Sequence, residues 1–142
     1  MSVLYVDSSA FVKLYVTEDQ TETEQVERAL RRNVEVASCL IAYAEVCGTF
    51  GRQFQQGRLA EETYWATRRA FEADWENVNA TEVTPELSSL AADLLKSQTG
   101  LRAMDALHLA SALMLRKQQP LNFLSFDKLL NAAAQALMPD AF

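Results

Sequence analysis

The sequence is poor in the residues that mark several large functional classes. Among 142 residues it has only 4 glycines and 3 prolines, and it contains no glycine-rich phosphate-binding loop. Its single histidine, His108, and its two cysteines, Cys39 and Cys47, lack the spacing of a zinc site, so we expect buried, reduced thiols. These absences exclude a P-loop nucleotide-binding protein and a zinc centre.

Long apolar runs are also missing. The first apolar stretch, residues 3–6, is interrupted by Asp7, and no basic segment precedes it, so the sequence predicts neither a signal peptide nor a membrane span. The net charge of −6 argues against a protein that holds nucleic acid by broad electrostatic attraction. We therefore expect a cytoplasmic protein that does not bind membranes, in which any nucleic-acid role depends on a local site.

The composition and the pattern of apolar residues predict one α/β domain over residues 1–142. Hydrophobic residues make up 49% of the chain and charged residues 23%, which is typical of a folded globular protein. Strands are expected at residues 3–6, 34–38, 82–84 and 122–126, with a weak final strand near Met138, and helices at 8–15, 18–32, 40–56, 59–75, 85–99, 103–117 and 128–137. The alternation predicts a central parallel sheet of four to five strands, with residues 40–75 as a helical hairpin joined at Gly57.

Four acidic residues follow the predicted strands or begin the helices after them. Asp7 ends the first strand, Glu45 lies early in the helix after the second, Asp105 lies in the first turn of a helix, and Asp127 follows the last clear strand. In an open parallel sheet, ligands bind beyond the carboxyl ends of the strands. The sequence therefore predicts that these four carboxylates gather at one edge.

A simpler interpretation is that the acids cap helices. Asp at a helix start commonly accepts from free backbone N–H groups, which suits Asp7 and Asp127 taken singly. Capping does not explain Glu45 and Asp105, which lie among apolar residues where an unpaired carboxylate is costly. Clustered carboxylates repel one another unless a cation joins them, and oxygen ligands suit Mg²⁺ or Mn²⁺.

Several neighbouring residues are candidates for supporting roles. His108, three residues after Asp105, would orient that carboxylate or contact substrate, or else be a packed, hydrogen-bonded core histidine. Ser8 and Ser125 adjoin the acids and would position a metal-bound water or simply cap helices. The candidates for phosphate contacts, with ordinary solvated charge as the alternative, are Lys13, Arg52, Arg58 and Arg102.

The whole chain resembles the PIN-domain ribonucleases, in particular the VapC-like toxins of type II toxin–antitoxin systems. The segments that carry the resemblance are VLYVDSSAFVKLY with Asp7, SCLIAYAEV with Glu45, LRAMDALHLASAL with Asp105 and NFLSFDKLL with Asp127. Position 125, which often carries threonine in the family, is serine here and keeps the hydroxyl. The resemblance implies a three-layer α/β/α PIN-like fold in which the hairpin is an insertion.

The resemblance also implies an activity, a cofactor and partners. It implies a metal-dependent endoribonuclease, with Asp7 and Asp105 as the main ligands of Mg²⁺ or Mn²⁺ and with Glu45 and Asp127 binding directly or through water. One ion or two would lower the pKa of a water molecule and neutralise charge on the phosphate. The expected partners are an RNA substrate, a cognate VapB-like antitoxin and a second copy in a homodimer.

Two other functions are compatible with parts of the sequence. The first is a catalytically silent PIN-like module that binds RNA or a protein partner. The second is aspartyl phosphoryl transfer of the haloacid-dehalogenase or receiver type, which also places Asp after the first strand. Ser9 stands where the aspartate of a DxD motif would be needed, and no paired acid precedes Asp7, so the sequence disfavours this second alternative.

Overall fold

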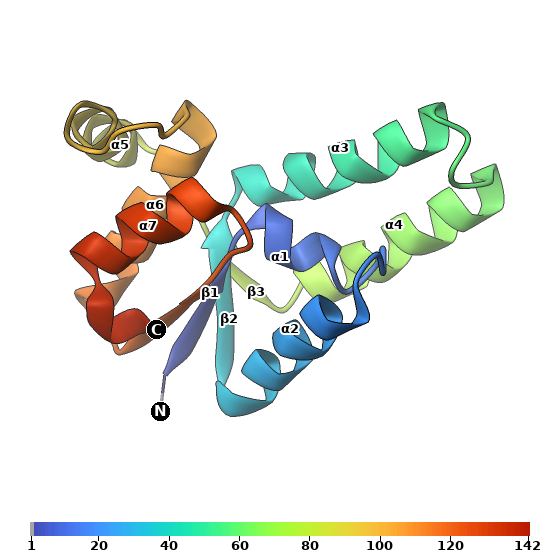
Figure 1. Ribbon diagram of the computed structural model, residues 1–142, viewed down its shortest axis with the longest axis horizontal. Helices are drawn as coiled ribbons and strands as arrows, with labels where there is room; N and C mark the ends of the chain where they lie inside the picture. The colour runs from blue at the N-terminus through green and yellow to red at the C-terminus, as the bar shows by residue number, and fades with distance from the viewer. Residues whose placement is uncertain (1) are drawn as a thin grey trace.

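The computed structural model describes residues 2–142, and its centre is a four-stranded parallel sheet (Figure 1). The strands are β1 (Val3–Val6), β2 (Glu35–Cys39), β3 (Val78–Thr81) and β4 (Leu121–Leu124), in the spatial order β3-β2-β1-β4. β1 pairs in parallel with both β2 and β4, and β2 pairs with β3. The carboxyl ends of all four strands therefore point to the same edge of the sheet.

Helices cover both faces of the sheet, as the sequence predicts. They are α1 (Ser8–Val12), α2 (Gln20–Arg32), α3 (Ile41–Gln55), α4 (Glu61–Trp75), α5 (Pro85–Ser97), α6 (Ala103–Arg116) and α7 (Lys128–Leu137), followed by the short 3₁₀ helix η1 (Pro139–Ala141). Figure 1 shows α5, α6 and α7 on one side of the sheet and α1 to α4 on the other. Across residues 2–142, no helix is both long and apolar enough to cross a bilayer.

The alternation of side chains along β1 divides the core into two layers. Val3 and Tyr5 face α5, α6 and α7, where many of the buried residues on those helices are alanines; we call this the alanine layer. Leu4 and Val6 face α1 to α4, where aromatic rings gather around Phe71; we call this the aromatic layer. The three-layer α/β/α fold expected from the sequence is confirmed.

The predicted helical hairpin is α3 and α4, which pack against each other and project away from the sheet (Figure 1). Gly57 in their connection has φ +76°, a left-handed conformation that glycine adopts without a steric penalty. At the base of the hairpin the ring of Phe71 meets the rings of Phe11 and Phe50 at centroid distances of 5.9 and 6.1 Å. The hairpin is therefore anchored to α1 by aromatic packing.

Three local predictions are wrong. The third strand is β3 at Val78–Thr81 rather than residues 82–84, which are exposed and end at Thr84, the N-cap of α5. No strand forms near Met138 in the described chain, because this residue caps α7 and leads into η1. The first helix, α1, ends at Val12 rather than at residue 15; its N-cap is Asp7, as the capping interpretation expects, since the side chain accepts from the backbone N–H of Ala10.

Candidate active site

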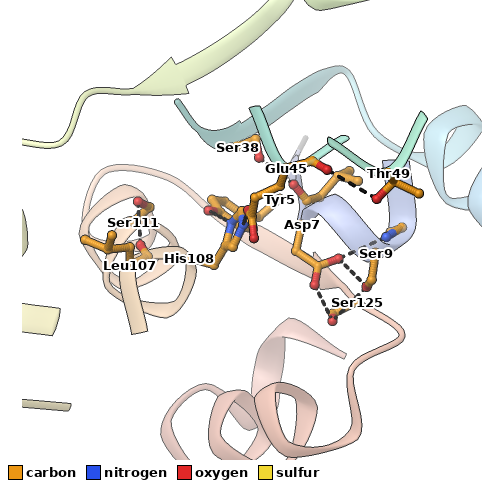
Figure 2. A network of polar contacts seen from close by, with 12 residues as sticks. Tyr5, Asp7, Ser9, Ser38, Glu45, Thr49, Leu107, His108, Ser111 and Ser125 are labelled. Carbon is orange, nitrogen blue, oxygen red and sulfur yellow. Dashed lines mark hydrogen bonds and ion pairs between the residues drawn. The ribbon is translucent and has the colours of Figure 1, made fainter. Parts of the chain in front are cut away.

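Asp7 is the most buried acid of the candidate site. The parallel pairing of β1 with β4 continues one residue beyond the strands, where the Asp7 N–H donates to the carbonyl of Leu124 at 3.3 Å. Its side chain is only 3% exposed. Oδ1 accepts from Ser9 Oγ at 2.7 Å and from the Ala10 N–H at 3.0 Å, and Oδ2 accepts from Ser125 Oγ at 2.6 Å. Figure 2 shows the Ser9 and Ser125 side chains beside Asp7.

Burial raises the pKa of Asp7, against the opposing effects of the bond from Ser125, the charge of His108, and the bonds from Ser9 and Ala10. The folded protein thus holds an acid whose ionised form is disfavoured by desolvation. The hydrogen bonds orient the group without removing that cost. A nearby cation would favour the ionised form.

Glu45 is held by a chain of side chains that leads from β1 through α6 to α3 (Figure 2). Tyr5 Oη lies 2.8 Å from His108 Nδ1, and His108 Nε2 lies 2.7 Å from Glu45 Oε1. Burial raises the pKa of Tyr5 well above its usual value, so its hydroxyl keeps its proton. A carboxylate can only accept, so a neutral imidazole bonded to Glu45 carries its hydrogen on Nε2, and Nδ1 accepts from the Tyr5 hydroxyl. The Nε2–H then donates to the Glu45 carboxylate, which fixes the direction of that carboxylate.

The other two acids lie at the starts of α6 and α7. Asp105 Oδ2 accepts from the Arg102 backbone N–H at 3.2 Å, and Asp127 Oδ1 accepts from the Leu130 N–H at 2.9 Å. The pKa of Asp105 is raised first by burial and then by the negative charges of Asp127 and Glu45. The fold therefore brings Asp127 and Glu45 near enough to Asp105 for their charges to disfavour its ionised form.

The donor set suits a hard divalent ion by its chemistry, because it consists of carboxylate oxygens that repel one another. Within residues 2–142, however, no three Asp, Glu, His or Cys side chains already stand in a metal-binding arrangement. Each carboxylate instead accepts from a neighbouring donor. The residues fit a metal ion as ligands that would turn toward it rather than as a preformed cage.

The supporting residues differ from the sequence-based expectations in detail. Ser125 donates to Asp7 and also accepts from the Asp127 N–H at 3.0 Å, so it joins two of the acids. Ser9, which the sequence does not mark as a supporting residue, donates to Asp7; a hydroxyl two residues after an Asp is the signal that could have indicated it. His108, 1% exposed, bonds Glu45 rather than Asp105, and is the packed, hydrogen-bonded core histidine of the alternative interpretation.

The four candidate phosphate-binding cations are placed unequally. Lys13 pairs with Glu22 at 3.1 Å and lines a cavity of about 420 Å³ beside Ser9 and Phe126. Arg102 is exposed at the start of α6, three residues before Asp105.

The two arginines of the hairpin lie progressively farther from the acids. Arg52 donates to Thr49 Oγ1 at 3.2 Å, and Thr49 in turn donates to the Glu45 carbonyl. Arg58 lies in the connection at the far end of the hairpin, ten α3 residues beyond Glu45, or about 15 Å along the axis. Lys13 therefore shares a cavity with Ser9, a hydrogen-bond partner of Asp7, and the Arg102 backbone contacts Asp105, whereas Arg58 lies away from the acids.

Comparison with known proteins agrees with this architecture. The family model described as "PIN domain" matches residues 4–136. Two ribonucleases of Mycobacterium tuberculosis, VapC45 and VapC49, are each 33% identical to this chain over 114 residues, which cover 80% of it and 76% of each relative. The crystal structure of M. tuberculosis VapC20, a toxin that cleaves the sarcin-ricin loop, superposes with a TM-score of 0.66 at 21% identity, covering 92% of this chain and 94% of that one.

The three comparisons agree with one another and with the order of elements found above. The structural likeness supports the fold, and the match over nearly the whole chain together with the two sequence relatives supports the family. This chain therefore belongs to the PIN-domain family, among its VapC-type ribonucleases.

Proposed function

We propose that this protein is a metal-dependent endoribonuclease that acts as the toxin of a toxin–antitoxin pair and uses Mg²⁺ or Mn²⁺. The observation that carries the proposal is the placement of four acids by the ends of β1 and β4 and the starts of α3, α6 and α7, with Asp7 buried. Burial raises the pKa of Asp7 and of Asp105, and the charges of Asp127 and Glu45 raise that of Asp105 further. Such a set is stabilised when a divalent cation joins it. Membership of a ribonuclease family supplies the reaction class.

The four acids would have different roles. Asp7 and Asp105 would be the principal ligands, with Glu45 and Asp127 binding directly or through water. When bound, the ion would lower the pKa of a water molecule and neutralise charge on the scissile phosphate. Glu45, oriented by His108, would accept a proton from the attacking water, while Ser125 keeps Asp7 aligned.

The proposed partners follow from the family. They are an RNA substrate, a VapB-like antitoxin that covers the acids, and a second copy of the chain in a homodimer. We propose that these interactions occur in the cytoplasm and that residues 1–142 act as one domain. Lys13 and Arg102 are the cations that we assign to substrate phosphates near the acids.

An RNA-cleavage assay tests the proposal. The purified chain should cut RNA when Mg²⁺ or Mn²⁺ is present and stop when the ion is chelated, and Asp7→Ala should slow cleavage by at least about 100-fold. Asp93→Asn is the matched control, because Asp93 is an exposed acid on α5. Equal rates for Asp7→Ala and the wild type would overturn the assignment.

One observation favours the silent-module alternative: within the described chain, no three acids stand ready to bind an ion. In that case the chain would bind RNA or a protein partner without cleaving any RNA tested. Metal-independent RNA binding by the wild type, without cleavage in Mg²⁺ or Mn²⁺, would identify it.

A further inference from the structure

A groove of about 570 Å³ lies between α2 and the outer edge of β4 and takes no part in the site described above. One wall is a stripe along α2 formed by Thr21, Gln25, Arg28 and Arg32, which lie on one helical face. The opposite wall includes Asn122 of β4 and the half-exposed ring of Phe142. Apolar residues, among them Leu124 and Phe123, line the rest, so the groove is polar along α2 and apolar and aromatic along β4 and the C-terminal segment.

The charge of the groove is opposite to that of the chain as a whole. The net charge is −6, yet the groove is lined by two arginines and by no acidic side chain. Within residues 2–142, neither Arg28 nor Arg32 forms an ion pair with a carboxylate. They are one helical turn apart, with Cβ atoms spaced by about 5–6 Å. Two neighbouring guanidinium groups without counter-charges favour an anionic ligand.

Two amide side chains of the groove, those of Asn33 and Asn122, form hydrogen bonds. Asn122 Nδ2 donates to Asn33 Oδ1 at 2.9 Å and to Ser2 Oγ at 3.2 Å, while Asn33 Nδ2 donates to the Ala29 carbonyl at 2.8 Å. These bonds tie β4 to the end of α2. The positions of both walls are therefore fixed relative to each other.

We propose that this groove binds single-stranded RNA as a second contact region, with Arg28 and Arg32 on successive phosphates and the Phe142 ring against a base. Cationic side chains together with an exposed aromatic ring are the usual means of binding single strands without sequence preference. The inference deepens the proposed ribonuclease function and rests on it.

The groove is connected to the acidic site through β4. Leu124 lines the groove, and the next residue, Ser125, donates to Asp7. β4 is an edge strand, so no further strand covers its outer side in the described sheet. An RNA strand that follows this edge would run from the acids into the groove. The groove would then supply a basic surface to a protein whose negative net charge otherwise gives little attraction to RNA.

Fluorescence anisotropy with a labelled oligouridine of about 12 nucleotides, in chelator so that cleavage is suppressed, tests the inference. The variants are Arg28→Gln, Arg32→Gln, their double and Phe142→Ala. Arg31→Gln is a matched control: Arg31 and Arg32 are adjacent basic residues in the last turn of α2, and only Arg32 lines the groove. The double variant should bind about tenfold more weakly and lower the slope of log affinity against log salt by about 1.4.

The outcomes separate this inference from the proposed function. The inference is supported if the Arg28 and Arg32 variants bind RNA more weakly while Arg31→Gln binds like the wild type. A lower RNA affinity of Phe142→Ala, which keeps every side-chain charge, would support it independently. Equal losses for Arg31→Gln and Arg32→Gln would mean unspecific attraction and would overturn it, as would unchanged binding in the double variant. If the wild type cleaves RNA while the groove variants bind normally, only the groove inference fails. If the wild type neither binds nor cleaves RNA, the proposed function fails as well.

Discussion

The alanine layer and the aromatic layer cover the same sheet but pack it in different ways. In the alanine layer, small buried residues such as Ala91 of α5 and Ala106 and Ala110 of α6 allow close approach of the elements. In the aromatic layer, the Phe71 ring contacts five other rings, those of Phe11, Tyr15, Tyr43, Phe50 and Trp75. One layer relies on close backbone approach and the other on large side chains.

The candidate site draws its residues from both layers. Asp105 and His108 lie on α6 of the alanine layer, whereas Glu45 lies on α3 of the aromatic layer. The His108–Glu45 bond and the Asp7–Ser125 bond join elements distant in sequence. A substitution that destabilises either layer should therefore disturb the acids. The aromatic layer should be most sensitive to lost side-chain volume, and the alanine layer to added side-chain volume.

The largest expected effect is on the aromatic layer. Phe71 is fully buried, so Phe71→Ala removes the centre of the ring cluster and leaves a cavity. We expect the free energy of unfolding to fall by about 3–5 kcal/mol, measured by urea denaturation. Phe54→Ala, on α3 but 42% exposed, should cost less than half as much; equal costs would contradict the anchoring role of Phe71.

The alanine layer should be most sensitive to added volume. Ala110 is fully buried on α6, so Ala110→Leu overpacks the layer and should lower the free energy of unfolding by about 1–3 kcal/mol. Ala70→Leu, an exposed site on α4, should change it little. A neutral Ala110→Leu would show that the layer is not close-packed.

Tyr5→Phe tests the link between the layers. The change leaves His108 Nδ1 without its donor, so stability should fall by about 1 kcal/mol, and RNA cleavage should slow by about tenfold as Glu45 loses orientation. Urea denaturation and cleavage rates measure the two effects. Tyr64→Phe is the control, since the Tyr64 hydroxyl only accepts a bond from Arg68 of the same helix. An unchanged cleavage rate in Tyr5→Phe would show that the hydrogen-bonded chain from Tyr5 through His108 to Glu45 does not contribute to catalysis.

The smallest expected effect is a change in melting temperature at Asp105. The folded-state pKa of Asp105 is raised above its ordinary value of 3.8, so its contribution to stability is greatest at low pH and declines as pH rises through that folded pKa. Asp105→Asn should therefore raise the melting temperature of the metal-free protein by about 2 °C near pH 7 and change it little below about pH 4. Differential scanning calorimetry at both pH values checks the sign, and a lowered melting temperature near pH 7 would contradict it.

The sequence predicted most of the fold, because long periodic helices and buried strands carry strong local signals. β3 was misplaced because its residues, Val78 to Thr81, form a short edge strand that is half-buried and includes an exposed asparagine. The position of β3 depends on its pairing with β2, and this pairing cannot be predicted from the local sequence pattern.

The acids of the candidate site could be selected from sequence because each lies just after a strand or within the first two turns of a helix. Tyr5 and the His108–Glu45 bond could not, since they join positions 103 and 63 residues apart through the facing of β1 and α6. Arg58 was an expected phosphate contact, yet the length of α3 carries it away from the acids. Contacts of this kind depend on tertiary geometry rather than on local pattern.

Isothermal titration calorimetry with Mn²⁺ tests most directly whether these carboxylates hold a divalent ion. The wild type and Asp93→Asn should bind Mn²⁺ with the same affinity, whereas Asp105→Asn should bind at least about tenfold more weakly, because one ligand is lost. Equal Mn²⁺ affinity in Asp105→Asn and the wild type would contradict the account.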